Sequence, residues 1–94
     1  MLIKNQIYSE GTITKKKYKN GLLAVFLNDR KGESVAELSI NDDSIELDFN
    51  EFVLKNYSEN SEIAQSLLDS KLIIPTDRFV LIGSHLCPIC KVAI

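Results

Sequence analysis

An uninterrupted apolar run at residues 22–27, Leu-Leu-Ala-Val-Phe-Leu, constrains the fold of this chain more than any other feature. The run has the length of a β-strand, and a strand without polar positions is covered on both faces. Asn20 and Gly21 directly precede it, and an Asn-Gly pair between two extended segments is typical of a type I′ hairpin turn. The pattern therefore predicts a hairpin whose second strand is central in a sheet.

Apolar and polar patterning elsewhere predicts further strands. Ile45, Leu47 and Phe49 alternate with polar residues, which indicates an extended or bent segment. Pro88 has no amide hydrogen to donate, so we expect the last strand to lie at an edge or to be bulged there. Four other segments are predicted to be extended: residues 12–18, 34–40, 79–82 and 86–92.

One helix is predicted in the second half of the chain, over residues 59–70. Residues 58–62, Ser-Glu-Asn-Ser-Glu, supply N-cap side chains and early carboxylates. Apolar residues follow at helical spacing: Ile63, Ala64, Leu67 and Leu68. The sequence thus predicts an α+β fold, a mostly antiparallel β-sheet of about five strands with one α-helix packed on one face.

Size and charge narrow the class of protein. The chain has 94 residues, 45% of them apolar, so we expect residues 1–94 to fold as a single domain. A net charge of −2 is too weak for a molecule-wide attraction to nucleic acid, which would need a local basic patch. No apolar run approaches the ~20 residues of a membrane span, and the start of the chain lacks a signal-peptide pattern. We expect a cytoplasmic protein with no membrane partner.

His85, Cys87 and Cys90 form the sharpest candidate for chemistry, because thiolates three residues apart and a nearby imidazole can bind zinc. A structural zinc site takes four ligands, and the chain has no other Cys or His, so the fourth would be a carboxylate such as Asp77, a water or a second subunit's residue. A redox Cys pair would begin a helix, for which too few residues follow. We favour the interpretation that both cysteines are small apolar side chains packed in a terminal strand and that the protein has no cofactor, with zinc binding as the alternative.

A basic run at residues 15–19, with Tyr18 inside it, could contact phosphates and stack a base. Alternation along a strand sends Lys15 and Lys17 to one face and Lys16 to the other, and lysines on an outer strand also prevent edge-to-edge aggregation. We favour the interpretation that these lysines are the solvated side chains of an edge strand. The sequence contains no recognisable set of nucleophile, base and acid, so we expect a non-enzyme.

Three stretches together resemble a family of small proteins, grouped as a domain of unknown function, that bacterial conjugative elements, plasmids and phages carry. The match spans residues 18–92, and the helix entry Tyr-Ser-Glu-Asn at residues 57–60 is its most specific part. The resemblance implies an accessory protein of a mobile element and brings no catalytic residues. The stretches are residues 21–27, 32–33 and 36–41; residues 55–60 and 67–68; and residues 75–78, 83 and 88–91.

The expected function is therefore protein–protein binding to a host or mobile-element protein, for example to inhibit a defence system such as a CRISPR effector. One helix covers one side of a sheet, so we predict that the face away from the helix is an association surface for the target or for a homodimer. The predicted contact residues are Leu23, Val25, Leu27, Lys15, Lys17 and Tyr18. The alternatives are a nucleic-acid-binding module that uses residues 15–19 and a small zinc-binding structural module.

Overall fold

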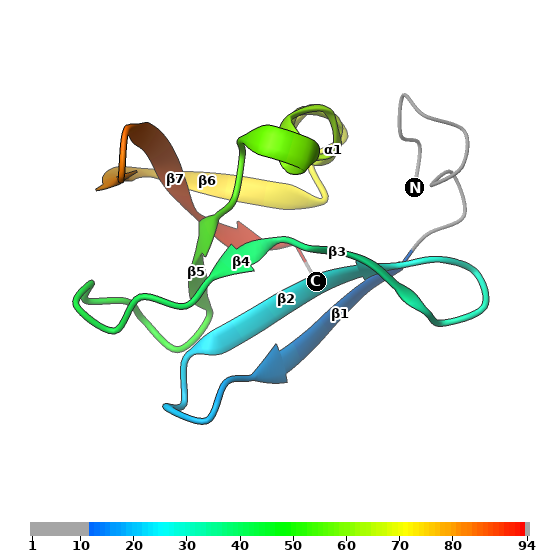
Figure 1. Ribbon diagram of the computed structural model, residues 1–94, viewed down its shortest axis with the longest axis horizontal. Helices are drawn as coiled ribbons and strands as arrows, with labels where there is room; N and C mark the ends of the chain where they lie inside the picture. The colour runs from blue at the N-terminus through cyan, green and yellow to red at the C-terminus, as the bar shows by residue number, and fades with distance from the viewer. Residues whose placement is uncertain (1–11, 94) are drawn as a thin grey trace.

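The computed structural model describes residues 12–93, whose strands form two antiparallel sheets beside one helix (Figure 1). The first sheet has the order β1-β2-β3, with β1 at Thr12–Lys17, β2 at Leu23–Asn28 and β3 at Ser34–Glu37. The second has the order β4-β5-β7-β6, with β4 at Ser39–Ile40, β5 at Glu51–Leu54, β6 at Ile73–Ile82 and β7 at His85–Val92. A 3₁₀ turn, η2 at Ser58–Asn60, leads into α1 at Ser61–Asp69.

The α+β class is confirmed, but the predicted count of about five strands is too low, since the described residues form sheets of three and four strands. The segment 34–40 is not one strand, because Leu38 interrupts it. The Leu38 amide donates to the Val25 carbonyl at 2.8 Å, and the Leu38 carbonyl accepts from the Lys55 amide at 2.7 Å. Leu38 therefore links β2 of the first sheet to the end of β5 in the second.

The hairpin between β1 and β2 lies where the sequence predicts it, but its turn is not of type I′. That type needs a positive φ at both central residues, and among the described residues Gly21 has one (+89°) whereas Asn20 does not. The Gly21 amide donates to the Tyr18 carbonyl and the Tyr18 amide to the Leu22 carbonyl, both at 2.9 Å. A three-residue loop closed by a left-handed glycine has this bonding, and the β2–β3 hairpin repeats it with Gly32 at +86°.

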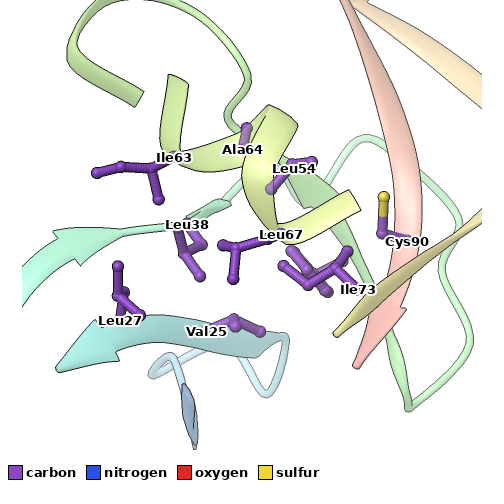
Figure 2. Packing of buried hydrophobic residues seen from close by; sticks show 10 residues of the cluster. Val25, Leu27, Leu38, Leu54, Ile63, Ala64, Leu67, Ile73 and Cys90 are labelled. Carbon is purple, nitrogen blue, oxygen red and sulfur yellow. The ribbon is translucent and has the colours of Figure 1, made fainter. Parts of the chain in front are cut away.

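The main hydrophobic core lies between the two sheets and α1, and side chains of β2 and α1 point into it from opposite sides (Figure 2). Val25 and Leu27 are each 0% exposed, and Leu23 packs against the same cluster. The prediction of an association surface is thus wrong for Val25 and Leu27. The physical reason is that β5, β6 and β7 form a second sheet that, with α1, covers this side of β2.

A smaller core lies on the other face of the second sheet and contains Val53, Cys87 and Ile89. Ile45 and Leu47, from the connection between β4 and β5, pack against it. That connection is not a strand, because its backbone consists of turns and irregular segments until Glu51. The part of the second sheet around Val53 and Ile89 is therefore covered on both faces, once by the main core and once by this loop.

The predicted helix is confirmed within a few residues, and α1 buries Ile63, Ala64 and Leu67 in the main core. Asn60, buried at the end of η2, donates from its side-chain Nδ2 to the Glu37 carbonyl at 2.8 Å. This bond fixes the helix entry to the end of β3. Among residues 12–93, no helix is long and apolar enough to cross a membrane.

The last strand, β7, lies between β5 and β6, so the expectation of an edge position is wrong, whereas its pairing with β6 is irregular next to Pro88. Pairing of β5 with β7 reaches only to Ile89, so the next residue, Pro88, needs no amide hydrogen on that side. The irregularity lies in β6, where the register shifts between Pro75 and Phe79. The Thr76 hydroxyl bridges this bulge by donating to the Ile89 carbonyl at 2.8 Å.

Candidate functional site

The hairpin of β6 and β7 exposes three large apolar side chains on one face. Phe79 is 58% exposed, Leu81 66% and Leu86 60%. Leu81 pairs directly with Leu86 across the two strands, and Phe79 lies two residues from Leu81, so the three side chains share a face. We call Phe79, Leu81 and Leu86 the hairpin patch.

The hairpin patch adjoins the edge of a sheet, because β6 is the outermost strand of the order β4-β5-β7-β6. Within residues 12–93, β6 pairs with β7 along one edge, and the other edge of β6 has no strand partner. Beyond Asp77 and Arg78, the last four residues of β6, Phe-Val-Leu-Ile at 79–82, carry no charge, whereas β1, one edge of the other sheet, carries Lys15, Lys16 and Lys17. Charged residues block pairing at an edge strand, and an uncharged apolar edge invites it.

The opposite face of the hairpin is anchored to the molecule. Val80 packs in the smaller core, and the His85 ring stacks on Tyr57 with centroids 4.0 Å apart and planes 4° from parallel. The Asn56 side chain donates to the Leu86 carbonyl at 3.2 Å. The hairpin patch is therefore presented by a hairpin that the body of the protein fixes in place.

A second feature is a cavity of about 340 Å³ beside β1, which we call the lysine pocket. The register pairs Lys15 with Val25 and Lys17 with Leu23, so both lysines lie on the core-facing side of the sheet, at its margin. The ammonium of Lys16 lies 5.8 Å from the centroid of the Phe26 ring. The lining comprises Lys15, Lys16, Lys17, Leu23, Phe49, Asn50 and Val92.

A buried carboxylate holds the turn that carries Phe49. Glu51 is 5% exposed and accepts from the Asp48 amide at 3.0 Å, while the Glu51 amide donates to the Asp48 carbonyl at 3.0 Å. Arg78 donates to the same Glu51 carboxylate at 3.0 Å and to the Glu46 carbonyl at 2.7 Å. These bonds fix a turn whose tip displays the Phe49 ring, 86% exposed, at the lysine pocket.

Tyr18, predicted to be the aromatic contact, has another place in the structure. Its hydroxyl donates to the Glu37 carboxylate and lies 2.7 Å from the Ser39 hydroxyl, which also accepts from the Val25 amide at 2.9 Å. Burial raises the pKa of Tyr18 to about 12, and the hydrogen bond to Glu37 adds to the rise. Tyr18 thus ties the end of β1 to the β3–β4 junction.

The exposed aromatic ring beside the lysines is that of Phe49, which the sequence interpretation missed. Alternation with Ile45 and Leu47 assigned it to the apolar face of an extended segment. The signal that could have identified it is its position between Asp48 and Asn50, since both residue types favour turns.

The three predicted zinc ligands are not brought together. Cys87 lies in the smaller core and Cys90 in the main core, on opposite faces of β7, because residues three apart on a strand point to opposite sides. His85 stacks on Tyr57 instead. Burial raises the pKa of the Cys87 thiol, and it raises that of Cys90 to about 12. In the described part of the chain, no group of three or more His, Cys, Asp or Glu could hold a metal ion.

The two surfaces offer different binding chemistry. The hairpin patch combines apolar side chains with an unpaired strand edge, whereas the lysine pocket combines ammonium groups with an exposed ring.

Comparison of the chain with family models, with curated proteins and with solved structures finds no match.

Proposed function

We propose that this protein is a non-enzymatic binding protein that docks on another protein through the hairpin patch and the free edge of β6. The observation that carries the proposal is the exposure of Phe79, Leu81 and Leu86 on one face of an anchored hairpin at the end of a sheet. Contiguous apolar patches of a few hundred Å² on soluble proteins are often functional.

The size of the patch favours a partner that also pairs with the strand edge. Three side chains exposed by 58 to 66% present on the order of 300 Å². A stable interface buries roughly 800 Å² on each partner, so the hairpin patch is too small to support one alone. An extended segment that adds to β6 supplies backbone hydrogen bonds as well as apolar contacts. The partner we propose therefore presents an exposed, apolar β-strand.

The resemblance to proteins of mobile elements supports a host or mobile-element protein as this partner. Inhibition of a defence complex, such as a CRISPR effector, is an activity that a small protein can perform by occupying a surface. The same edge could instead pair with β6 of a second copy and give a homodimer, which the experiment below distinguishes.

The experiment compares tagged wild type with Leu81→Glu and Phe49→Ala in capture from a bacterial host lysate, followed by titration of each variant with the purified captured protein. Leu81 and Phe49 are 66% and 86% exposed, so neither change should unfold the chain. Leu81→Glu should lose the partner, because it places a charge in the apolar contact, and Phe49→Ala should retain it. Equal affinity of Leu81→Glu and wild type would refute the proposal. Analytical ultracentrifugation of the purified chain alone measures whether it forms a homodimer.

A further inference from the structure

We infer that the lysine pocket binds a nucleotide unit of single-stranded nucleic acid, with its phosphate on Lys15 and Lys17 and its base against Phe49. This site is separate from the hairpin patch and adds a second ligand to the proposed protein docking. The overall charge of −2 gives no general attraction, so binding depends on this local arrangement.

The charge of the site comes from one strand. Lys15 and Lys17 leave β1 on the same side and both line the lysine pocket. Ammonium groups are phosphate ligands, and they supply most of the sequence-independent affinity of proteins for nucleic acid. Lys16 also contributes to the lining, but its ammonium lies over the Phe26 ring. Lys19 follows in the turn, so positive charge continues along the chain beyond Lys17, which favours a strand over a free nucleotide.

Protection of the β1 edge against aggregation is the competing explanation of the lysines. It does not account for Phe49, which belongs to the turn before β5 and presents a ring 86% exposed beside them. The bonds of Glu51 to Asp48 and Arg78 stabilise the backbone of this turn. An exposed ring that lines the same pocket as the lysines is suited to stack a base, because every base has a π-face.

The dimensions and the remaining lining agree with one nucleotide. A volume of about 340 Å³ lies at the lower end of small-molecule sites, roughly 300–1,000 Å³. Leu23 and Val92 supply apolar contact for a sugar or base, and the Asn50 side chain can both donate and accept a hydrogen bond. The lining thus provides charge for a phosphate and apolar surface for a base.

The experiment is fluorescence anisotropy of a short labelled oligothymidine titrated with the full chain at low and rising salt. Phe49→Ala should weaken binding by about 5- to 150-fold, the effect of losing one stacked base. Lys17→Gln should lower the slope of log affinity against log salt by about 0.7, because one phosphate contact is lost. Phe79→Ala, which removes an exposed ring of the hairpin patch, is the matched control and should bind like wild type.

A second measurement uses thymidine monophosphate as a competitor of the labelled oligothymidine. Displacement of the oligothymidine by the mononucleotide at much higher concentration supports a site for one unit within a strand. Equal affinity for both, lost in Phe49→Ala, keeps the pocket as a nucleotide site but overturns its assignment to a strand. No binding of oligothymidine at low salt, or binding that Phe49→Ala leaves unchanged, overturns the inference. Partner capture by Phe49→Ala reports on the protein docking independently.

Discussion

Removing the Tyr18 hydroxyl in Tyr18→Phe tests the bond network that joins the end of β1 to the β3–β4 junction. The change deletes the bond to the Glu37 carboxylate and the 2.7 Å contact with the Ser39 hydroxyl, and it leaves the ring in place. Ser39 keeps its bond from the Val25 amide. The effect therefore isolates the contribution of one hydroxyl group.

The expected loss follows from the two partners. A hydrogen bond to a charged group contributes roughly 1.5–3 kcal/mol and a neutral one roughly 0.5–1.5 kcal/mol. Glu37 is exposed, so water hydrates its carboxylate when the hydroxyl is removed, and the contribution of this bond lies at the low end of its range. We expect the free energy of unfolding to fall by about 1–2 kcal/mol, and Tm to fall by roughly 4–8 °C for each kcal/mol.

The pH dependence gives a second signature. In the folded wild type the pKa of Tyr18 is raised from 10.0 to about 12, first by burial and then by the bond to Glu37. The stabilising contribution is therefore complete below pH 10 and is lost as the pH rises towards 12. Since Tyr18 is partly exposed, we discount this contribution to about 1–2 kcal/mol. The Tm difference between wild type and Tyr18→Phe should narrow over that range.

The assay is thermal unfolding followed by circular dichroism from pH 7 to 12. Tyr57→Phe, which keeps the ring stack on His85, is the matched control and should change Tm less. An unchanged Tm in Tyr18→Phe at pH 7, or a difference from wild type that stays constant up to pH 12, would refute the proposed role of Tyr18.

Three further substitutions test the elements that frame the two surfaces. Gly21→Ala should lower the free energy of unfolding by about 1–2 kcal/mol in thermal melts, because a φ of +89° strains an L-residue. A Cβ at this position would meet no atom within 4 Å, so the loss reports backbone strain alone, and a wild-type Tm would contradict the turn. Leu67→Ala should cost ~2–5 kcal/mol in urea unfolding since the side chain is fully buried, whereas exposed Gln65→Ala should cost little; equal midpoints would place that helix face outside the core. Glu51→Ala should cost about 1–3 kcal/mol in the same assay, through loss of the bonds to Arg78 and Asp48, and an unchanged midpoint would contradict the clamp.

Local signals were enough to predict the β1–β2 hairpin and the helix, because Gly21 and the spacing of Ile63 and Leu67 act within a few residues. The division into two sheets was not predictable in this way. It depends on Leu38, whose amide bonds to Val25 and whose carbonyl accepts from Lys55, and neither contact leaves a trace in the local pattern. The burial of β2 follows from that division, since β5, β6 and β7 close over it.

The two candidate surfaces show the same limit. The apolar segment 79–82 predicts a strand, but its place at an edge depends on β7 inserting between β5 and β6. Phe49 is exposed because the turn from Asp48 to Glu51 breaks the alternation that Ile45 and Leu47 begin. In both cases pairing between distant segments decides which apolar side chains reach the surface.

Amide hydrogen exchange of the chain, alone and bound to the captured partner, tests the proposed docking most directly. Strand addition at β6 would give the backbone of residues 79–82 new hydrogen-bond partners and remove it from water. We predict slower exchange at residues 79–82 in the complex, with little change at residues 12–17. Protection confined to residues 12–17, with residues 79–82 exchanging as in the free chain, would contradict docking through the β6 edge.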